Sequence, residues 1–187
     1  MSKLTEDFDF IKHRVYDIDS IKNYVSSFFD EWFLDTSRQN TFETHKDTMS
    51  YFLYKANLDW QKNEIFFVSK ETNDKNLLML VEPIINDLEK IHDGLRGNVL
   101  FIKLKAMHNI REHKDEGSYL VSSRRHHIPI VTSNQTIFGV GSKKINMAIG
   151  ECWEINNTRP HSVENTSSTD RIHLLVDIMP NKEIGKQ

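Results

Sequence analysis

Cysteine is nearly absent from this sequence. Cys152 is the only cysteine among 187 residues. An intrachain disulfide needs two cysteines and the cysteine-rich zinc modules need several, so both are excluded. A chain without structural disulfides fits a reducing compartment, and we expect a cytoplasmic protein.

Long apolar runs and an excess of basic residues are also missing. No stretch is both long and apolar enough to predict a membrane-spanning helix, and the acidic start leads into no apolar segment typical of a secretory signal. The formal net charge of -3 and an isoelectric point of about 6.3 argue against nucleic-acid binding. We therefore expect neither a membrane nor a nucleic acid as partner, and no particular oligomeric state is favoured.

Glycine and proline are sparse, with seven and four copies, and they form no linker. No repeat or low-complexity tract divides the chain. The hydrophobic content of 38% is sufficient for a buried core. Residues 1–187 are therefore expected to form a single domain.

Helical periodicity is confined to the first half of the chain. Apolar residues recur at three- and four-residue steps in 18–32 and again in 77–91, which predicts two amphipathic helices. Asp74 is the expected N-cap of the second helix and Gly94 its end. Because Pro83 lacks a backbone donor, we expect a kink or two abutting helices there.

Strand-like runs replace the helical pattern after residue 97. We expect 1–96 to be a mostly helical support, 97–178 a β-rich core and 179–187 a polar tail. The mainly β fold is expected to be a sandwich or barrel with N-terminal helices on one side. The candidate strands are 99–104, 127–131, 136–140, 145–149, 152–155 and 171–178.

Histidine is the residue in excess, with nine copies. A His-x-Asp motif occurs at 45–47 and at 113–115, and residues two apart on an extended segment project to one face, where they can chelate one ion. About 0.7 such pairs are expected by chance, so either copy alone is weak. The second copy follows a strand-like run, whereas the first lies in a polar segment.

Two later residues favour the second copy. His161 follows a turn at 158–160, where a strand can begin, and Arg171 stands ten residues further on. Two histidines and one carboxylate form the facial triad typical of non-haem iron, which leaves coordination positions open. His113, Asp115 and His161 are therefore the candidate metal ligands.

These residues resemble the Fe(II)/2-oxoglutarate dioxygenases. The runs RRHHIPI, GECWEINNTRPHSVEN and RIHLLVDI are similar to the aspartyl/asparaginyl β-hydroxylase-like branch, which includes bacterial proline hydroxylases. The resemblance covers 97–178 and implies a double-stranded β-helix, a cupin-like jelly-roll barrel. It implies Fe(II), 2-oxoglutarate and O2 as cofactors, with His113, Asp115 and His161 both catalytic and metal-binding.

The resemblance also implies co-substrate contacts. Arg171 corresponds to the arginine that grips the distal carboxylate of 2-oxoglutarate, a task suited to a planar guanidinium. Arg125 and His127 correspond to an Arg-x-His pair on the other carboxylate, with the register open by one residue because Arg124 is adjacent. His126 is expected to point to the face opposite His127.

The implied activity is hydroxylation of an aliphatic C–H bond of an amino acid, either free and proline-like or a peptidyl Pro, Asp or Asn. 2-Oxoglutarate would be converted to succinate and CO2. Asp115 stands where the β-hydroxylase itself has glycine, which favours the small-molecule or proline-hydroxylase side of the branch. Since no repeat domain is present to hold a large protein substrate, we expect a free amino acid or a short peptide. Trp153, Asn157 and His173 are candidate substrate contacts, with a core role equally open for Trp153.

Two alternatives stay open. A cupin-type metal-dependent enzyme would share the barrel, and His161-x-x-x-Asn165 is similar to the second cupin motif, but the first motif is missing. A non-catalytic metabolite-binding barrel is the alternative outside enzymology. His13, His92 and His108 belong to no motif and are expected to be ordinary surface residues.

Overall fold

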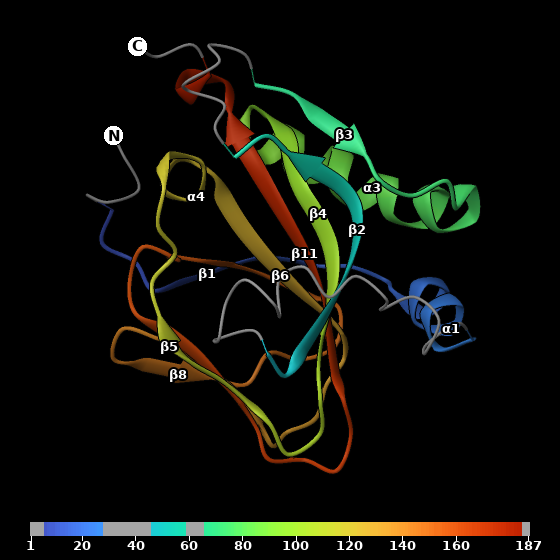
Figure 1. The fold of residues 1–187 in the computed structure, drawn as a ribbon, viewed down its shortest axis with the longest axis vertical. Helices are drawn as coiled ribbons and strands as arrows, with labels where there is room; N and C mark the ends of the chain where they lie inside the picture. The colour runs from blue at the N-terminus through green and yellow to red at the C-terminus, as the bar shows by residue number, and fades with distance from the viewer. Residues whose placement is uncertain (1–5, 28–45, 59–65, 185–187) are drawn as a thin grey trace.

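The computed structural model describes residues 6–27, 46–58 and 66–184. Within these ranges two antiparallel sheets face each other (Figure 1). The larger sheet has the order β1 (Phe10–Val15), β9 (Glu151–Ile155), β6 (Arg124–Val131), β11 (Arg171–Pro180), β4 (Gly94–Leu104), β2 (Thr48–Ala56) and β3 (Val68–Lys70). The smaller sheet has the order β5 (Asn109–His113), β10 (His161–Asn165), β7 (Thr136–Val140) and β8 (Lys143–Ile145).

The central strand β11 shows how the sequence builds this architecture. All ten of its residues are buried, because the strand is covered on both faces. Alternate side chains point to opposite faces of a strand. Ile172, Leu174 and Val176 join the main hydrophobic core, whereas Arg171 and Asp177 point into the space between the two sheets. We call these the outer and inner faces of the larger sheet.

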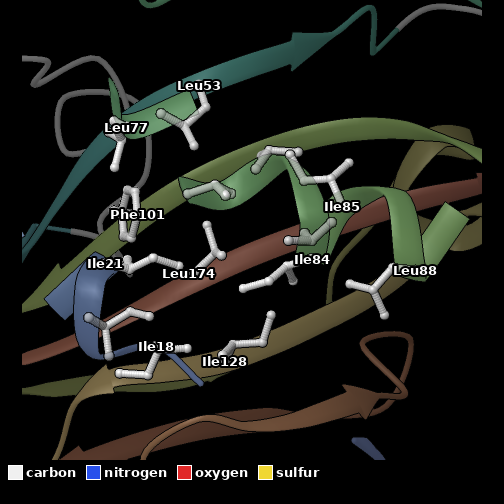
Figure 2. Packing of buried hydrophobic residues seen from close by; sticks show 14 of the residues in the cluster. Ile18, Ile21, Leu53, Leu77, Ile84, Ile85, Leu88, Phe101, Ile128 and Leu174 are labelled. Atoms are coloured by element: carbon white, nitrogen blue, oxygen red, sulfur yellow. The ribbon is translucent and has the colours of Figure 1, made fainter. Parts of the chain in front are cut away.

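Helices α1 (Asp19–Ser27) and α3 (Lys75–His92) cover the outer face. Figure 2 shows Ile84, Ile85 and Leu88 of α3 directed toward the sheet that carries Leu174 and Ile128. Each fully buried Leu or Ile side chain stabilises the fold by roughly 1.5–3 kcal/mol relative to an exposed one. This packing fixes the strands that carry the polar residues of the inner face.

The predicted helix ends are close to those observed. Asp74 caps α3 by accepting a hydrogen bond from the backbone N of Leu77 at 3.0 Å. Pro83 lies inside one continuous helix, so of the two alternatives that of abutting helices is wrong and that of a kink stays a prediction; burial of the apolar face outweighs the lost donor. The helix ends at His92, and Gly94 already begins β4, where a Cβ would stand 2.4 Å from the backbone O of Met179.

The N-terminal part is less helical than expected. Strands β1, β2 and β3 lie within 1–96 and extend the larger sheet at both edges. β2 lies between β4 and β3, and its side chains alternate irregularly between buried and partly buried positions, so its sequence gives no clean period of two. The predicted stripe at 18–32 is buried at Ile18, Ile21 and Val25, and its remainder lies outside the described residues.

Five of the six predicted strands correspond to β4, β6, β7, β9 and β11. The sixth, 145–149, is mostly irregular, because only Ile145 belongs to β8 and the chain then leads into a turn at Gly150, which has a φ of 78°. The expected polar tail begins later than 179, since Met179 and Pro180 complete β11 and a 3-10 turn, η3 (Asn181–Glu183), follows. β5 was not predicted, because its NIREH sequence is largely polar.

Candidate metal centre

His113 and His161 meet at one end of the smaller sheet. His113 ends β5, His161 begins β10, and the two residues are cross-strand partners with ring centroids 4.2 Å apart. The Nδ1 of His113 lies 2.8 Å from the backbone O of Arg111, and that of His161 lies 3.0 Å from the O of Arg159. A ring nitrogen that is hydrogen-bonded to a carbonyl oxygen must carry the proton, so Nε2 of each histidine keeps its lone pair for a metal ion.

Asp115 completes the cluster. Its Oδ1 lies 3.9 Å from the Nε2 of His113 and 3.9 Å from that of His161. Its Oδ2 is turned away and accepts hydrogen bonds from Arg125 Nη1 at 2.5 Å and from Asn157 Nδ2 at 2.8 Å. The three ligand atoms lie within 4.8 Å of one another, so the structure brings together the three predicted ligands.

The protonation states of this cluster suit a metal ion. Burial lowers the pKa of His161 to about 4, which keeps the imidazole neutral. Burial alone would raise the pKa of Asp115, but the charge of Arg125 and the cluster histidines hold it well below its usual range. Metal ligands must be neutral imidazole and ionised carboxylate. Two such nitrogens and one oxygen, gathered on one side, fit Fe(II) and leave positions for other ligands.

Arg125 supports this carboxylate, and its predicted contact with the co-substrate stays a prediction. Its Nε and Nη2 donate to the two carboxylate oxygens of Asp177 at 2.9 and 2.8 Å, and its Nη1 donates to Asp115. Tyr119 donates to the same Asp177 at 3.2 Å. Arg124 lies on the outer face, where it bonds Glu154, so the two arginines are divided by strand alternation. Arg125 is thus a positioning residue for Asp115.

Arg171 is the most unusual group on the inner face. It is 1% exposed, and no ion pair reaches it from any residue that the structure describes. Its Nη2 lies 2.7 Å from Nδ1 of His173. A guanidinium only donates, so His173 accepts at Nδ1 and carries its proton on Nε2. Burial lowers the pKa of Arg171 to about 9.

Unsatisfied donors accompany this buried cation. Within the described part of the chain, Nε of Arg171 and Nε2 of His173 are buried without a hydrogen-bond partner, as is Nδ1 of His127. A buried polar group without a partner costs about 1–3 kcal/mol, which a ligand can recover. A positive charge beside free N–H donors selects an anion such as a carboxylate.

His127 links this anion-selective group to the metal cluster. Its ring centroid lies 5.8 Å from that of His173 and 5.0 Å from that of Phe138. Burial and then the charge of Arg171 hold the pKa of His127 well below its usual range, and His161 also contributes. Arg171 in turn lies 5.8 Å over the Phe138 ring. The predicted residues Arg171 and His127 therefore share one buried region with the metal cluster.

The predicted substrate contacts occupy different places. Asn157 is fully buried and its Nδ2 donates to Asp115 and to the backbone O of Leu120 at 3.1 Å, so it positions the metal ligand. Trp153 is half-buried, donates to Glu151 at 2.9 Å and packs against the hydrophobic cluster between the sheets. His173 accepts a hydrogen bond from Arg171. Of the three, Trp153 is the least buried.

Comparison with protein families accounts for this arrangement. Residues 22–180 match the family model described as aspartyl/asparaginyl beta-hydroxylase. The chain belongs to that β-hydroxylase family. No curated protein matches the chain.

Solved structures show the same fold. The viral collagen prolyl hydroxylase of Paramecium Bursaria Chlorella virus-1, in its 2-oxoglutarate complex, aligns with a TM-score of 0.60 and 8% identity over 93% of this chain and 97% of that one. An oxidoreductase of the 2OG-Fe(II) oxygenase family from Burkholderia pseudomallei aligns with a TM-score of 0.51 and 10% identity over 71% and 67%. The predicted double-stranded β-helix is therefore confirmed.

The family and the fold together place this β-hydroxylase family member in the 2-oxoglutarate-dependent oxygenase superfamily. Within the described ranges, no helix has both the length and the apolarity needed to cross a membrane. Sequence reasoning missed Asp177 as part of the site. Its signal was an acidic residue inside the otherwise apolar end of RIHLLVDI, opposite Arg125 on the neighbouring strand.

Proposed function

We propose that this protein is an Fe(II)/2-oxoglutarate-dependent dioxygenase that hydroxylates an aliphatic C–H bond of an amino acid. One observation carries the proposal. A His–Asp–His cluster and a buried arginine without a counter-anion in the described structure face the same interior of one barrel. The first fits a metal ion and the second fits a carboxylate, as this reaction requires of its site.

The chain offers a ligand atom for each component. Nε2 of His113 and His161 and Oδ1 of Asp115 would hold Fe(II). Arg171, with Nε2–H of His173, would bind a carboxylate of 2-oxoglutarate. When bound, the iron supplies the oxidative chemistry that converts 2-oxoglutarate and O2 to succinate and CO2 while a substrate C–H bond is hydroxylated.

The residues around these ligands keep them oriented. Arg125 and Asn157 fix one carboxylate oxygen of Asp115, which leaves the other directed at the two histidines. Supporting groups of this kind set ligand geometry and tune metal affinity. The apolar side chains of Phe138, Val140 and Leu104, all buried, exclude water from the barrel interior. A dry site strengthens the attraction between Arg171 and a bound anion.

For the substrate we propose a free proline-like amino acid or a short peptide that contains Pro, Asp or Asn. The family is named for hydroxylation of aspartyl and asparaginyl residues, and the viral neighbour is described as a collagen prolyl hydroxylase. Asp115 supplies a third protein ligand, which supports the small-molecule or proline-hydroxylase side of the family. We propose no nucleic-acid or membrane partner.

The test is succinate release by the full chain after anaerobic loading with Fe(II). A panel of free proline, aspartate and asparagine, and of short peptides that contain them, is supplied with 2-oxoglutarate and O2. Release with at least one panel member is expected, and Asp115→Ala should abolish it. Glu164→Ala, which removes an exposed carboxylate from the strand that begins with His161, is the matched control and should retain turnover.

Two results would contradict the proposal. Turnover that persists in Asp115→Ala would show that the wrong carboxylate has been assigned. Thermal stabilisation by 2-oxoglutarate without succinate release from any panel member would indicate the alternative, a barrel that binds a metabolite without converting it.

A further inference from the structure

A second histidine cluster lies on the outer face of the larger sheet. It comprises His13 of β1, His92 at the end of α3, His126 of β6 and Glu154 of β9. Neither the family resemblance nor the proposed reaction assigns it a role. Its three histidines were expected to be ordinary surface or structural residues, yet the fold gathers them and Glu154 from four separate elements. We call them the outer cluster.

The ligand atoms of the outer cluster are close enough to share one ion. Nε2 of His92 lies 2.8 Å from Nε2 of His126, and Nε2 of His13 lies 2.9 Å from Oε2 of Glu154. Nε2 of His92 is 3.9 Å from the same Oε2, and all four atoms lie within 4.8 Å of one another. A tetrahedral zinc ion with bonds near 2.0–2.1 Å separates its ligand atoms by roughly 3.3 Å. The measured separations lie on both sides of that value.

Hydrogen bonds from neighbouring residues orient His126 and Glu154 of the outer cluster. Nδ1 of His126 lies 3.1 Å from the backbone O of Val176, so its Nε2 carries the lone pair toward the cluster. Arg124 donates to Oε1 of Glu154 at 3.1 Å and leaves Oε2 to the histidines. The metal centre on the inner face has the same construction, in which an adjacent arginine holds the second oxygen of Asp115. Such supporting contacts are typical of metal ligands.

Burial makes the outer cluster a closed site. The side chains of Glu154, His92 and His13 are 2%, 12% and 16% exposed, and His126 is fully buried. Three imidazoles and one carboxylate are donors for zinc-type cations, whereas Mg²⁺ and Ca²⁺ prefer oxygen alone. Four protein ligands leave no open position, which is characteristic of a structural site.

From these contacts we propose that the outer cluster binds one Zn²⁺-type divalent cation as a structural centre. The ion joins the N-terminal strand β1 and the C-terminal end of α3 to β6 and β9. It therefore ties the edge of the larger sheet to the helix that covers it. The site is independent of the proposed catalytic function, because it lies on the opposite face of β6.

Metal counting on the full chain tests this proposal. The protein is stripped with a chelator, titrated with Zn²⁺ alone and examined by native mass spectrometry. The wild type should bind two ions, one at each centre. His113→Ala/His161→Ala should still bind one, with Tm raised by about 5–10 °C at a 100-fold excess over Kd. Adding His13→Gln and His92→Gln to that variant should remove both the ion and the Tm rise.

His108→Gln is the matched control, because it changes a histidine that belongs to neither cluster. It should leave the count at two. Failure of His113→Ala/His161→Ala to bind Zn²⁺ would overturn the proposal and indicate a hydrogen-bonded histidine cluster without metal. Undiminished binding in the fourfold variant would overturn it as well.

A milder variant decides the question if the fourfold variant does not fold. His92→Gln alone, in the His113→Ala/His161→Ala background, alters only a partly exposed ligand at the rim of the cluster. Its Zn²⁺ affinity should fall by more than about tenfold. An unchanged affinity would contradict the proposal, whatever the outcome of the succinate assay.

Discussion

Strand β6 carries two contrasting polar sites on its two faces. Arg125 and His127 point into the barrel, toward the metal centre, whereas Arg124 and His126 point outward, into the outer cluster. At each site an arginine donates to the carboxylate oxygen that is turned away from the histidines: Arg125 to Oδ2 of Asp115, and Arg124 to Oε1 of Glu154. The sequence RRHH thus serves two separate clusters, because adjacent residues of a strand project to opposite faces.

The two sites differ in what they leave unsatisfied. On the inner face, Arg171 and His173 are buried with donors that no described residue accepts from. On the outer face, the cluster histidines and Glu154 face one another at hydrogen-bonding distances. Buried polar groups normally have partners. Unpaired donors therefore mark the inner face as the place that receives an anion, whereas the four converging ligand atoms of the outer cluster leave no open position and suit a structural ion.

Among variants that test this difference between the two sites, Arg171→Leu should have the largest effect. The variant removes the buried cation proposed to hold 2-oxoglutarate. Loss of one partner of a buried charge pair costs about 2–5 kcal/mol, so KM for 2-oxoglutarate should rise by about 10²–10³-fold. Arg159→Leu, which removes a more exposed arginine, is the control and should leave KM unchanged. An unchanged KM in Arg171→Leu would show that the anion binds elsewhere.

The second-largest effect is expected from replacing Arg125 or Arg124 by lysine, one at a time, because each arginine supports a different site. Lysine lacks the planar fork, so Arg125→Lys can no longer bridge Asp115 and Asp177. Loss of a supporting contact typically costs 10–100-fold in metal affinity. In isothermal titration calorimetry, Arg125→Lys should lower the Fe(II) affinity of the inner centre by about 10–100-fold and leave the outer cluster unchanged. Arg124→Lys should lower only the Zn²⁺ affinity of the outer cluster. Equal effects of both variants on one centre would refute the division of roles.

The sequence was sufficient for the strands whose burial is uniform and for the ligands that follow a known motif. β11, apolar apart from its polar inner-face residues, and the Asp74 cap of α3 were predicted because local pattern and tertiary environment agree there. β5 and β2 were missed because they are polar or only partly buried. Periodicity reports burial, and it weakens where a strand is polar or only partly buried.

The outer cluster and the partners of the inner-site residues could not be predicted from sequence spacing. His13, His92 and Glu154 are far apart in sequence, and only strand pairing and the end of α3 bring them together. The expected co-substrate role of Arg125 illustrates the same point. A motif places the residue on the correct face of β6, but its partner Asp177 comes from the neighbouring strand and becomes visible only in the register.

A smaller effect is expected from Asn157→Ala. Asn157 donates to Oδ2 of Asp115, and its backbone O accepts from the backbone N of the same residue at 3.0 Å. The variant removes the first contact, together with the bond to the backbone O of Leu120, and keeps the second. Fe(II) affinity should therefore fall by about tenfold, at the low end for a supporting residue. Asn146→Ala, which alters an amide remote from the metal centre, is the control for the titration. A loss as large as that of Arg125→Lys would show that Asn157 does more than orient the carboxylate.

The smallest effect concerns Tyr119, whose hydroxyl is buried behind Asp177. It accepts from the backbone N of Asn98 at 2.7 Å and donates to Asp177 at 3.2 Å. Tyr119→Phe leaves that N–H without its acceptor, which should lower the free energy of unfolding by about 1–3 kcal/mol in urea denaturation. Arg125 still holds Asp177 through two bonds, so Fe(II) affinity should stay within about threefold of the wild type. Tyr16→Phe, at a half-buried hydroxyl on the outer face, is the matched control and should cost less. A collapse of Fe(II) affinity in Tyr119→Phe would instead place the hydroxyl within the support of Asp115, and would extend the inner site one residue further from the metal.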